Sequence, residues 1–275
     1  MKKHLYMIAG SFLLVSACLA IAEDKNNETI HLFNGKDLTN FYTYLTAPPG
    51  EKKPLGKNND PENVFTVHDS MIHVSGKVFG CFTTEREFEN YHLIVEFKWG
   101  KKTWPPREGK ARDSGILLHC QGEDGGYGPW MESYECQMIE GGTGDFLVLS
   151  GKTKRSLTVE VEKRPTGEGK KHDEYYYKQG GEAVTLTGGR FNWYSRDPLW
   201  RDVVDFRGEH DVEKPVGQWN TLECICDGDK ITNILNGKVV NRGSKASITR
   251  GKILSQSEGA EVFFRKIDLK PLTKE

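Results

Sequence analysis

Apolar and polar residues alternate along much of this chain with the period of two that is typical of β-strands. Between Leu93 and Trp99 every residue of one face is apolar, while the other face carries Glu96 and Lys98. Residues 262–269 predict a last strand, in which the alternation slips near Lys266. A slip of this kind indicates a β-bulge, an extra residue in one strand of a pair.

Residues 219–241 predict three consecutive strands joined by two tight turns. Asp227-Gly228 and Asn236-Gly237 separate the apolar runs, and both dipeptides are favoured in two-residue hairpin loops, where positive φ angles are needed. No stretch keeps a 3.6-residue period over the length of a typical helix. We therefore predict an all-β fold in which two antiparallel sheets pack as a sandwich.

Two long segments interrupt the strand patterns, at residues 47–63 and 153–189, and both are rich in charged and turn-forming residues. Loops of that length in a sandwich usually lie at its rim and carry function. The segment 153–189 has too few apolar residues to form a core of its own. We therefore expect a single sandwich domain over residues 30–272.

Residues 1–22 have the composition of an export signal. Two lysines precede an apolar run over residues 5–15, and residues 20–22 offer a small-residue cleavage site. Residues 23–29 would then be the flexible N-terminus of an exported protein, periplasmic or extracellular. Processing at Cys18 instead would leave the protein lipid-anchored. The apolar run is too short to span a membrane, and no later segment approaches that length.

Charge and cysteine content narrow the classes of function. The formal net charge is −1 and no run of like charges occurs, which argues against a nucleic-acid partner. The cysteines beyond the leader are odd in number and match no zinc spacing; they are Cys81, Cys120, Cys136, Cys224 and Cys226. Cys120 and Cys136 could face each other, but small buried thiols are the favoured interpretation.

The stretch 113–144 contains the strongest candidate site. On a strand Glu135 and Gln137 point to one face, and a bulge before Glu140 would bring a second carboxylate onto that face. Paired carboxylates can divide the roles of acid and base if their surroundings separate their pKa values. The E-x-Q-x-x-E spacing is similar to the E-x-D-x-x-E motif of laminarinase-like glucanases, with Gln137 in place of Asp. The alternative is a solvated polar face.

His119 lies on a neighbouring strand pattern, where we expect it to share a face with Gly115 and Leu117. If this strand pairs with the one that holds Glu135, the imidazole would lie beside that carboxylate. His119 and the nearby acids could also hold a divalent cation, although no spacing identifies a metal. The alternative is a structural histidine.

Aromatic and basic side chains gather between residues 191 and 210. Trp and Tyr faces stack on sugar rings, and Arg donates hydrogen bonds to hydroxyl groups. Trp193, Arg196 and Trp200 are therefore candidates for a substrate-binding wall, together with Trp130. Packing of a long loop onto the sandwich would explain the same composition.

Several segments, taken in order, resemble the 3-keto-disaccharide hydrolase domain family. They are Leu32-Phe-Asn-Gly-Lys-Asp-Leu38, Asp113-Ser-Gly-Ile116, Trp130-Met-Glu-x-Tyr-Glu-x-Gln-x-Ile139, Gly217-Gln-Trp-Asn220 with Glu223, and the motif from Gly251 to Ile267. The resemblance implies a concanavalin A-like jelly-roll sandwich with long rim loops. It also implies an oligosaccharide or glycoside substrate that is already oxidised at C3. His119 stands where the family pattern has Arg.

For such a substrate the resemblance implies removal of the C2 proton, β-elimination of the glycosidic oxygen and then hydration. Glu135 or His119 would be the base, and Glu140 or Glu132 the acid. An arginine or a bound cation would stabilise the enolate. The arginine candidates and the other substrate-binding candidates are Arg196, Arg265, Asp113, Gln137, Trp130, Trp193 and Trp200.

Two other functions fit the same fold. A non-catalytic carbohydrate-binding module would bind glycans without turnover. An ordinary β-glucanase would cleave unoxidised glucan, but Gln137 at the middle position of the motif argues against it.

Overall fold

The computed structural model describes residues 28–164 and 174–273, so the expected export signal and Cys18 lie outside the described residues. Within the described ranges the chain forms strands and loops and no helix. No helix in those ranges could therefore cross a membrane.

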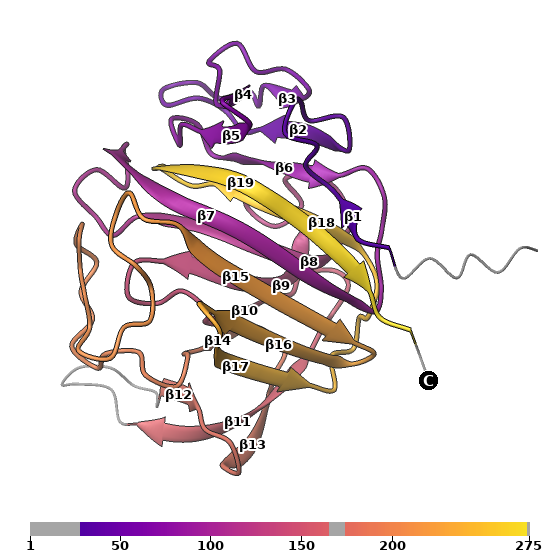
Figure 1. The fold of residues 1–275 in the computed structure, drawn as a ribbon, viewed down its shortest axis with the longest axis vertical. Coiled ribbons are helices and arrows are strands. Elements are labelled where there is room, and N and C mark those ends of the chain that lie inside the picture. The colour runs from indigo at the N-terminus through magenta and orange to yellow at the C-terminus, as the bar shows by residue number, and fades with distance from the viewer. Residues whose placement is uncertain (1–27, 165–173, 274–275) are drawn as a thin grey trace, which may run out of the picture.

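Two antiparallel sheets make up the fold, and Figure 1 shows them as two layers. Sheet A has the order β12-β11-β17-β16-β15-β7-β19-β5-β4, with β1 paired to β19 and β13 to β11. Its strands are β1 (Ile30–His31), β4 (Phe65–His68), β5 (Met71–Val74), β7 (Tyr91–Thr103), β11 (Leu157–Arg164), β12 (Glu174–Tyr177), β13 (Glu182–Leu186), β15 (Asn220–Asp227), β16 (Lys230–Leu235), β17 (Lys238–Ser244) and β19 (Ala260–Pro271).

Sheet B has the order β14-β10-β9-β8-β18-β6-β2-β3. Its strands are β2 (Phe41–Leu45), β3 (Gly56–Lys57), β6 (Gly80–Thr84), β8 (Asp113–Gln121), β9 (Glu132–Ile139), β10 (Phe146–Leu149), β14 (Gly189–Phe191) and β18 (Lys252–Ser257). The predicted sandwich of two antiparallel sheets is confirmed.

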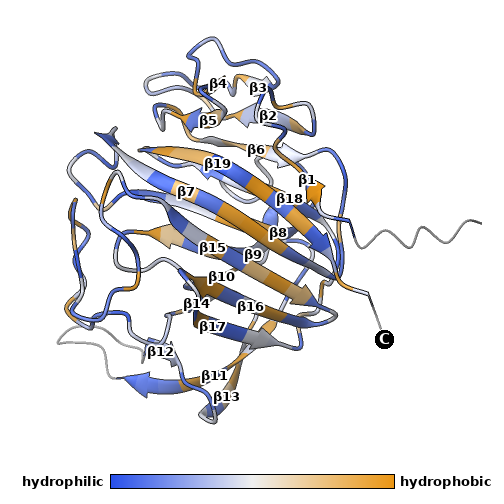
Figure 2. Cartoon of the chain, in the orientation of Figure 1, coloured by the Kyte–Doolittle hydropathy of each residue, from blue (hydrophilic) through white to orange (hydrophobic). Residues whose placement is uncertain are grey.

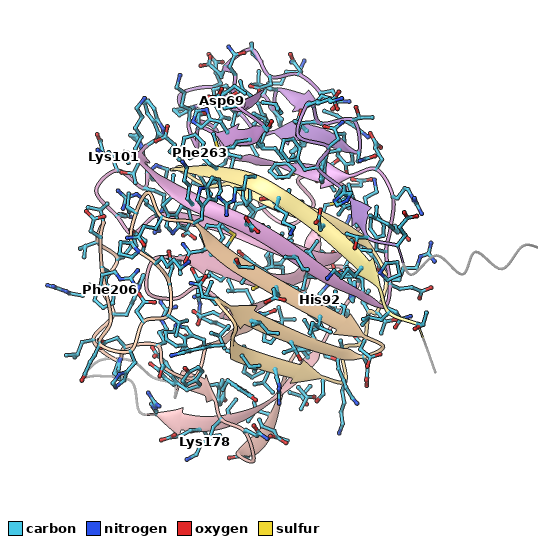
Figure 3. All side chains as sticks on the ribbon, in the orientation of Figure 1. Asp69, His92, Lys101, Lys178, Phe206 and Phe263 are labelled. Carbon is cyan, nitrogen blue, oxygen red and sulfur yellow. The ribbon has the colours of Figure 1, made fainter. Side chains whose placement is uncertain are left out.

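Sheet A has one face in the core and one in solvent. Figure 2 shows this as alternating apolar and polar bands along β7, β15 and β19. In β7 the inward side chains are those that the sequence predicts, namely Leu93, Val95, Phe97 and Trp99. His92 and Phe263 lie on the outer face (Figure 3), where Lys98 and Arg265 stack on Trp219.

Sheet B is covered on both faces in its centre, where β8 and β9 are buried over almost their whole length. Ile116, Leu118 and Tyr134 pack into the core between the sheets. The opposite face, which points away from sheet A, is called the site face below. Part of it is a second apolar cluster around Leu117 and Leu254, covered by aromatic side chains that include Tyr127 and Trp130.

The predicted meander is present as β15, β16 and β17. The predicted turn at Asn236-Gly237 is confirmed, and the first turn lies one residue later than predicted. Asn236 and Gly237 occupy the turn between β16 and β17 with φ angles of 49° and 80°. In the first hairpin Asp227 pairs with Lys230, so the turn consists of Gly228 and Asp229. The predicted bulge in the last strand is confirmed, between Phe264 and Lys266.

One expectation about the fold is wrong. The segment 153–189 is not a long loop, because its described residues form β11, β12 and β13, which extend sheet A at its edge. Cys120 belongs to the cluster on the site face and Cys136 to the core between the sheets, so the favoured interpretation of small buried thiols is confirmed. The described cysteines are all free and buried.

Gly76 tests how closely the segment that follows β5 packs against the start of β19. Its φ is +82°, and a Cβ there would lie 2.4 Å from the backbone oxygen of Ala260. We expect Gly76→Ala to lower the free energy of unfolding by more than about 1 kcal/mol in urea denaturation. Gly50→Ala is the control, since its φ is +86° but a Cβ there meets nothing within 4 Å. Equal losses in the two variants would contradict the close contact.

Candidate active site

The register of sheet B places polar side chains in rows across the site face. Leu117 pairs with Glu135, Glu135 with Leu147, and Leu147 with Arg190, so these four side chains form one row. Paired residues of antiparallel strands point to the same face, and neighbouring strands lie about 4.8 Å apart. Glu135 is therefore in the middle of the face, and Arg190 is two strands away at its edge.

The next row has a gap at its centre, which is Gly115. Gly115 pairs with Gln137 on β9, and Gln256 on β18 lies on its other side. A Cβ at Gly115 would lie 2.4 Å from Gln256 Oε1 and 2.5 Å from Glu135 Oε1. Any larger residue would displace these side chains, so glycine allows both of them to lie directly over the strand, on the floor of the site.

The amide groups beside this gap lack partners. Gln256 is fully buried, and neither its Nε2 nor its Oε1 has a hydrogen-bond partner. Gln137 donates from Nε2 to Asp113 Oδ1 over 2.6 Å, but its Oε1 has no partner. Buried polar groups in native proteins are nearly always hydrogen-bonded. The unpaired amide groups of Gln137 and Gln256, on either side of Gly115, are suited to bind the hydroxyl groups of a ligand.

Three carboxyl groups meet at this floor, those of Asp113, Glu135 and Glu258. Burial raises the pKa of Asp113 to about 7, although Arg107 and Arg190 oppose the shift. Burial, together with the negative charge of Asp113, raises the pKa of Glu135 to about 8. Burial and the same two acids raise the pKa of Glu258 well above its usual range. Because these charges repel one another, the three acids titrate as a set.

Two arginines supply positive charge next to the acids. Arg107 Nη2 lies 3.4 Å from Asp113 Oδ2 and is held by Asp202 at 2.7 Å. Arg190 Nη1 donates to Asp145 Oδ2 over 2.6 Å, and the fully buried Asp145 also accepts from Arg196. A carboxylate that binds two guanidinium groups fixes both of them in place.

The structure brings three of the sequence candidates together, Asp113, Glu135 and Gln137, and separates His119 from them. A bulge between Leu118 and Gln121 gives His119 a φ of +51° and turns its ring into the core between Tyr91 and Tyr134. The expectation that His119 shares a face with Gly115 is therefore wrong. Burial lowers the pKa of His119 to about 4, so the imidazole is neutral and enclosed.

Glu140 is not part of the floor either. The strand pairing is regular from Gly115–Gln137 to Asp113–Ile139, so the bulge that would turn Glu140 onto the site face is absent. Glu140 instead accepts from the Arg112 guanidinium over 2.7 Å and from the Arg112 backbone N–H over 2.9 Å. Both side chains are buried. This pair closes the end of the sandwich.

Glu132 and Trp130 hold loops at the far end of the site face. Glu132 accepts hydrogen bonds from the Thr153 hydroxyl and from the backbone of Thr153 and Lys152. Burial opposes the shift, but these bonds, the hydroxyl first, lower the pKa of Glu132 to about 2. Trp130 stacks on Phe79 and donates from Nε1 to Gly80 O over 3.1 Å. The Trp130 side chain thus closes this end of the site face instead of facing a ligand.

The remaining candidates divide between the edge of the site and other parts of the fold. Arg265 is on the outer face of sheet A, where it donates to Glu96, so it cannot reach the floor. Trp193 is buried and donates to Gly141 O. Arg196 stacks over half-buried Trp200 at 4.4 Å, and both lie at the edge of sheet B near Arg190.

Four residues of the floor were not among the sequence candidates for the site: Arg107, Arg190, Gln256 and Glu258. Gln256 and Glu258 have the two-residue spacing of one strand face, which is a usable signal. Arg107 and Arg190 lie in segments without such a pattern. As for a cation site, residues 28–164 and 174–273 contain no cluster of three or more His, Cys, Asp or Glu placed to hold a metal ion.

Fold and sequence together define the class of protein. The sandwich is an all-β jelly roll, and the sequence matches the model of the 3-keto-alpha-glucoside-1,2-lyase-like domain family over residues 28–270. The chain therefore belongs to this carbohydrate-active family, and the predicted resemblance is confirmed. A comparison with curated proteins gave no match.

Solved structures are similar to this chain at low sequence identity. A candidate glycosyl hydrolase from Parabacteroides distasonis aligns with a TM-score of 0.50 and 18% identity, covering 92% of this chain and 97% of that chain. A second one from the same organism gives 0.48 and 21%, covering 89% and 100%. A β-glucanase from Bacillus licheniformis gives 0.43 and 10%, covering 90% and 98%.

Glu140→Gln tests the structural role of the buried pair. The change removes the buried carboxylate and leaves the Arg112 guanidinium with only the largely exposed carboxylate of Asp205, and we expect a loss of about 3 kcal/mol in the free energy of unfolding. Urea denaturation at neutral pH measures it. Glu182→Gln is the matched control, because its pair with Lys163 is exposed and contributes less than about 1 kcal/mol. Similar small losses in both variants would argue against a structural pair.

Glu135→Gln tests the burial of the acid through stability. Since the pKa of Glu135 is raised from 4.5 to about 8, its protonated form stabilises the fold below pH 4.5, and this contribution is lost as the pH rises through about 8. Glutamine cannot ionise, so the variant does not lose this contribution to stability as the pH rises. We expect the variant to gain about 1–2 kcal/mol over wild type at high pH, which is several degrees in Tm.

Thermal melts between acid and mildly alkaline pH measure this gain. The difference in Tm between variant and wild type should grow with pH. A constant difference over the whole range would mean that Glu135 is not buried as an acid.

Proposed function

We propose that this protein cleaves the glycosidic bond of 3-keto-glycosides, including disaccharides, by removing the proton at C2. Membership of the 3-keto-alpha-glucoside-1,2-lyase-like family supports this substrate class. The observation that carries the proposal is the floor around Gly115, where buried acids with raised pKa values lie beside unpaired amides.

Glu135 is the proposed base. Its carboxylate borders the gap at Gly115, where the sugar ring would lie, and its pKa of about 8 is close to physiological pH. A base acts best when its pKa lies near the operating pH, because it then combines adequate ionisation with strong proton affinity. A fully exposed glutamate would be a much weaker base.

The ketone at C3 makes the C2 proton acidic, and proton transfer to Glu135 produces an enolate. The enolate electrons form the C1–C2 double bond as the C1–O bond breaks, and the leaving oxygen takes a proton from a second acid. Glu258 is the candidate, because burial and the neighbouring acids Asp113 and Glu135 raise its pKa well above its usual range. Water adds to C1 and a proton returns to C2, which completes hydrolysis.

Arg107 and Arg190 are the proposed stabilisers of the enolate oxygen. Both lie next to the acids and both are fixed by carboxylates of their own. Positive groups that are held in place before the reaction stabilise developing negative charge without reorganising. They take the part that the sequence interpretation gave to Arg196, Arg265 or a cation.

We further propose that the protein acts after export, in the periplasm or outside the cell. The support is the sequence of residues 1–22, with its lysines, its apolar run and its small-residue cleavage site. Cys18 remains an alternative processing site that would anchor the protein to lipid.

Turnover of a 3-keto-disaccharide by the Glu135→Gln variant tests the proposal. We expect kcat/KM to fall by about 10²–10⁴-fold, the range for loss of a general base, with the fold intact. Release of the 3-keto monosaccharide is measured by chromatography. The control is Glu223→Gln, the same change on the outer face of sheet A, where Glu223 pairs with His92.

Two results would contradict the proposal. Full turnover by Glu135→Gln would exclude Glu135 as the base. Glycan binding without turnover by the wild-type protein would indicate a carbohydrate-binding module, and release of sugar from unoxidised β-glucan would indicate an ordinary glucanase.

A further inference from the structure

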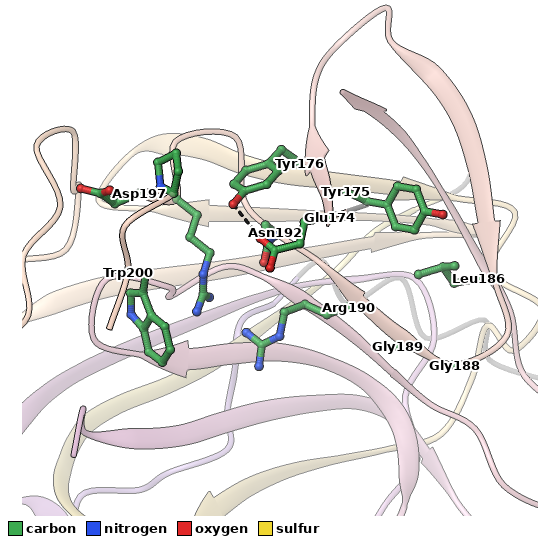
Figure 4. Close-up of a pocket in the computed structure, with 12 residues that line it drawn as sticks. Glu174, Tyr175, Tyr176, Leu186, Gly188, Gly189, Arg190, Asn192, Asp197 and Trp200 are labelled. Carbon is green, nitrogen blue, oxygen red and sulfur yellow. Dashed lines mark hydrogen bonds between the residues drawn. The ribbon is translucent and has the colours of Figure 1, made fainter. Parts of the chain in front are cut away.

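A cavity of about 660 Å³ opens at the edge of sheet B, next to the site face. Strands β12 and β14 form one side of it, and the segment 196–200 forms another (Figure 4). Its volume is within the range of about 300–1,000 Å³ that small-molecule sites usually have. The proposed reaction assigns no role to this space.

Arg190 connects the cavity to the floor of the site. Its side chain lines the cavity, and its charge acts on both Glu135 and Asp113. In the row across the sheet only Leu147 separates Glu135 from Arg190, so the cavity begins about 10 Å from the proposed base. That distance is comparable to the length of two linked sugar rings.

In the opposite direction across the site face, Tyr127 and Trp130 pack against the apolar side chains of Leu117 and Leu254. A cavity of about 570 Å³ on that side is lined mainly by apolar residues, among them Phe79 and Pro129. A hydroxylated ligand with one ring over Gly115 therefore finds polar partners on the side of Arg190.

The lining has the chemistry of a site for a neutral, hydroxylated group. Asn192 is buried and places its side-chain amide in the lining of the cavity. Trp200 and Tyr175 supply aromatic surface, which stacks on sugar rings. Asp145 binds both Arg190 and Arg196, and Asp197 adds a further negative charge to the lining. The two arginines can therefore donate hydrogen bonds to a ligand, but their positive charge is largely neutralised, which does not favour an anion.

We propose that this cavity is the leaving-group subsite and holds the second sugar of a disaccharide while the 3-keto ring lies over Gly115. The inference rests on the proposed function, because it assigns the two halves of the same substrate. It makes Asn192 and Trp200 specificity-determining residues rather than catalytic ones.

The test compares two substrates that differ only in the leaving group, a 3-keto-disaccharide and the methyl 3-keto-glycoside. Leu186→Trp adds bulk to the cavity wall, and we expect the ratio of kcat/KM for the disaccharide to that for the methyl glycoside to fall at least about tenfold. Leu199→Trp is the matched control, since Leu199 is 80% exposed and does not line the cavity. Its ratio should equal that of wild type.

Gly188→Phe is a second filling variant in case Leu186→Trp does not fold. A Cβ at Gly188 meets only the backbone oxygen of Val148, at 4.0 Å, so a side chain can begin there without a clash at its first atom. An unchanged ratio in the folded filling variants would overturn this inference alone. Absence of turnover of both substrates by the wild-type protein would overturn the proposed function and this inference with it.

Discussion

The site depends on the burial of acids against one another. Asp113 and Glu135 lie on adjacent strands of sheet B, and Glu258 directly follows the next strand, β18. Removal from water together with mutual repulsion raises the pKa values of the three acids. The guanidinium groups of Arg107 and Arg190 offset part of the free-energy cost of burying these acids. Asp202 binds Arg107 and Asp145 binds Arg190. The register of β8, β9 and β18, the glycine between them and the loops that cover the sandwich all serve to keep this group of acids in place.

The sequence was sufficient to predict the architecture and the centre of the site. Period-two alternation and tight-turn dipeptides predicted the sandwich, the meander and the last bulge, because each is a local property of the chain. Glu135 and Gln137 were also correctly expected to share one face, since this follows from a regular strand. Only regular pairing is needed for such an inference, and β8 and β9 pair regularly over that stretch.

The failures arise where pairing is irregular or a contact is non-local. A bulge at Leu118–Gln121 turned His119 inward, and no bulge turned Glu140 outward. Neither event has a residue pattern of its own, because each depends on what the neighbouring strand accepts. Arg190 reaches the acids from a strand far along the chain, and Arg265 lies on the other sheet. The sheet topology decides on which sheet, and on which face of it, an arginine lies. The alternation of apolar and polar residues along the chain does not reveal this topology.

The fate of the C2 hydrogen tests the central claim most directly. In D₂O, removal of the C2 proton followed by hydration puts solvent deuterium on C2 of the released 3-keto monosaccharide. We predict deuterium at that carbon by NMR in the first turnovers, beyond the exchange of the free product incubated without enzyme. Retention of the original C2 hydrogen would contradict the account, because direct displacement at C1 leaves that bond untouched and has no need of the buried acids as a base.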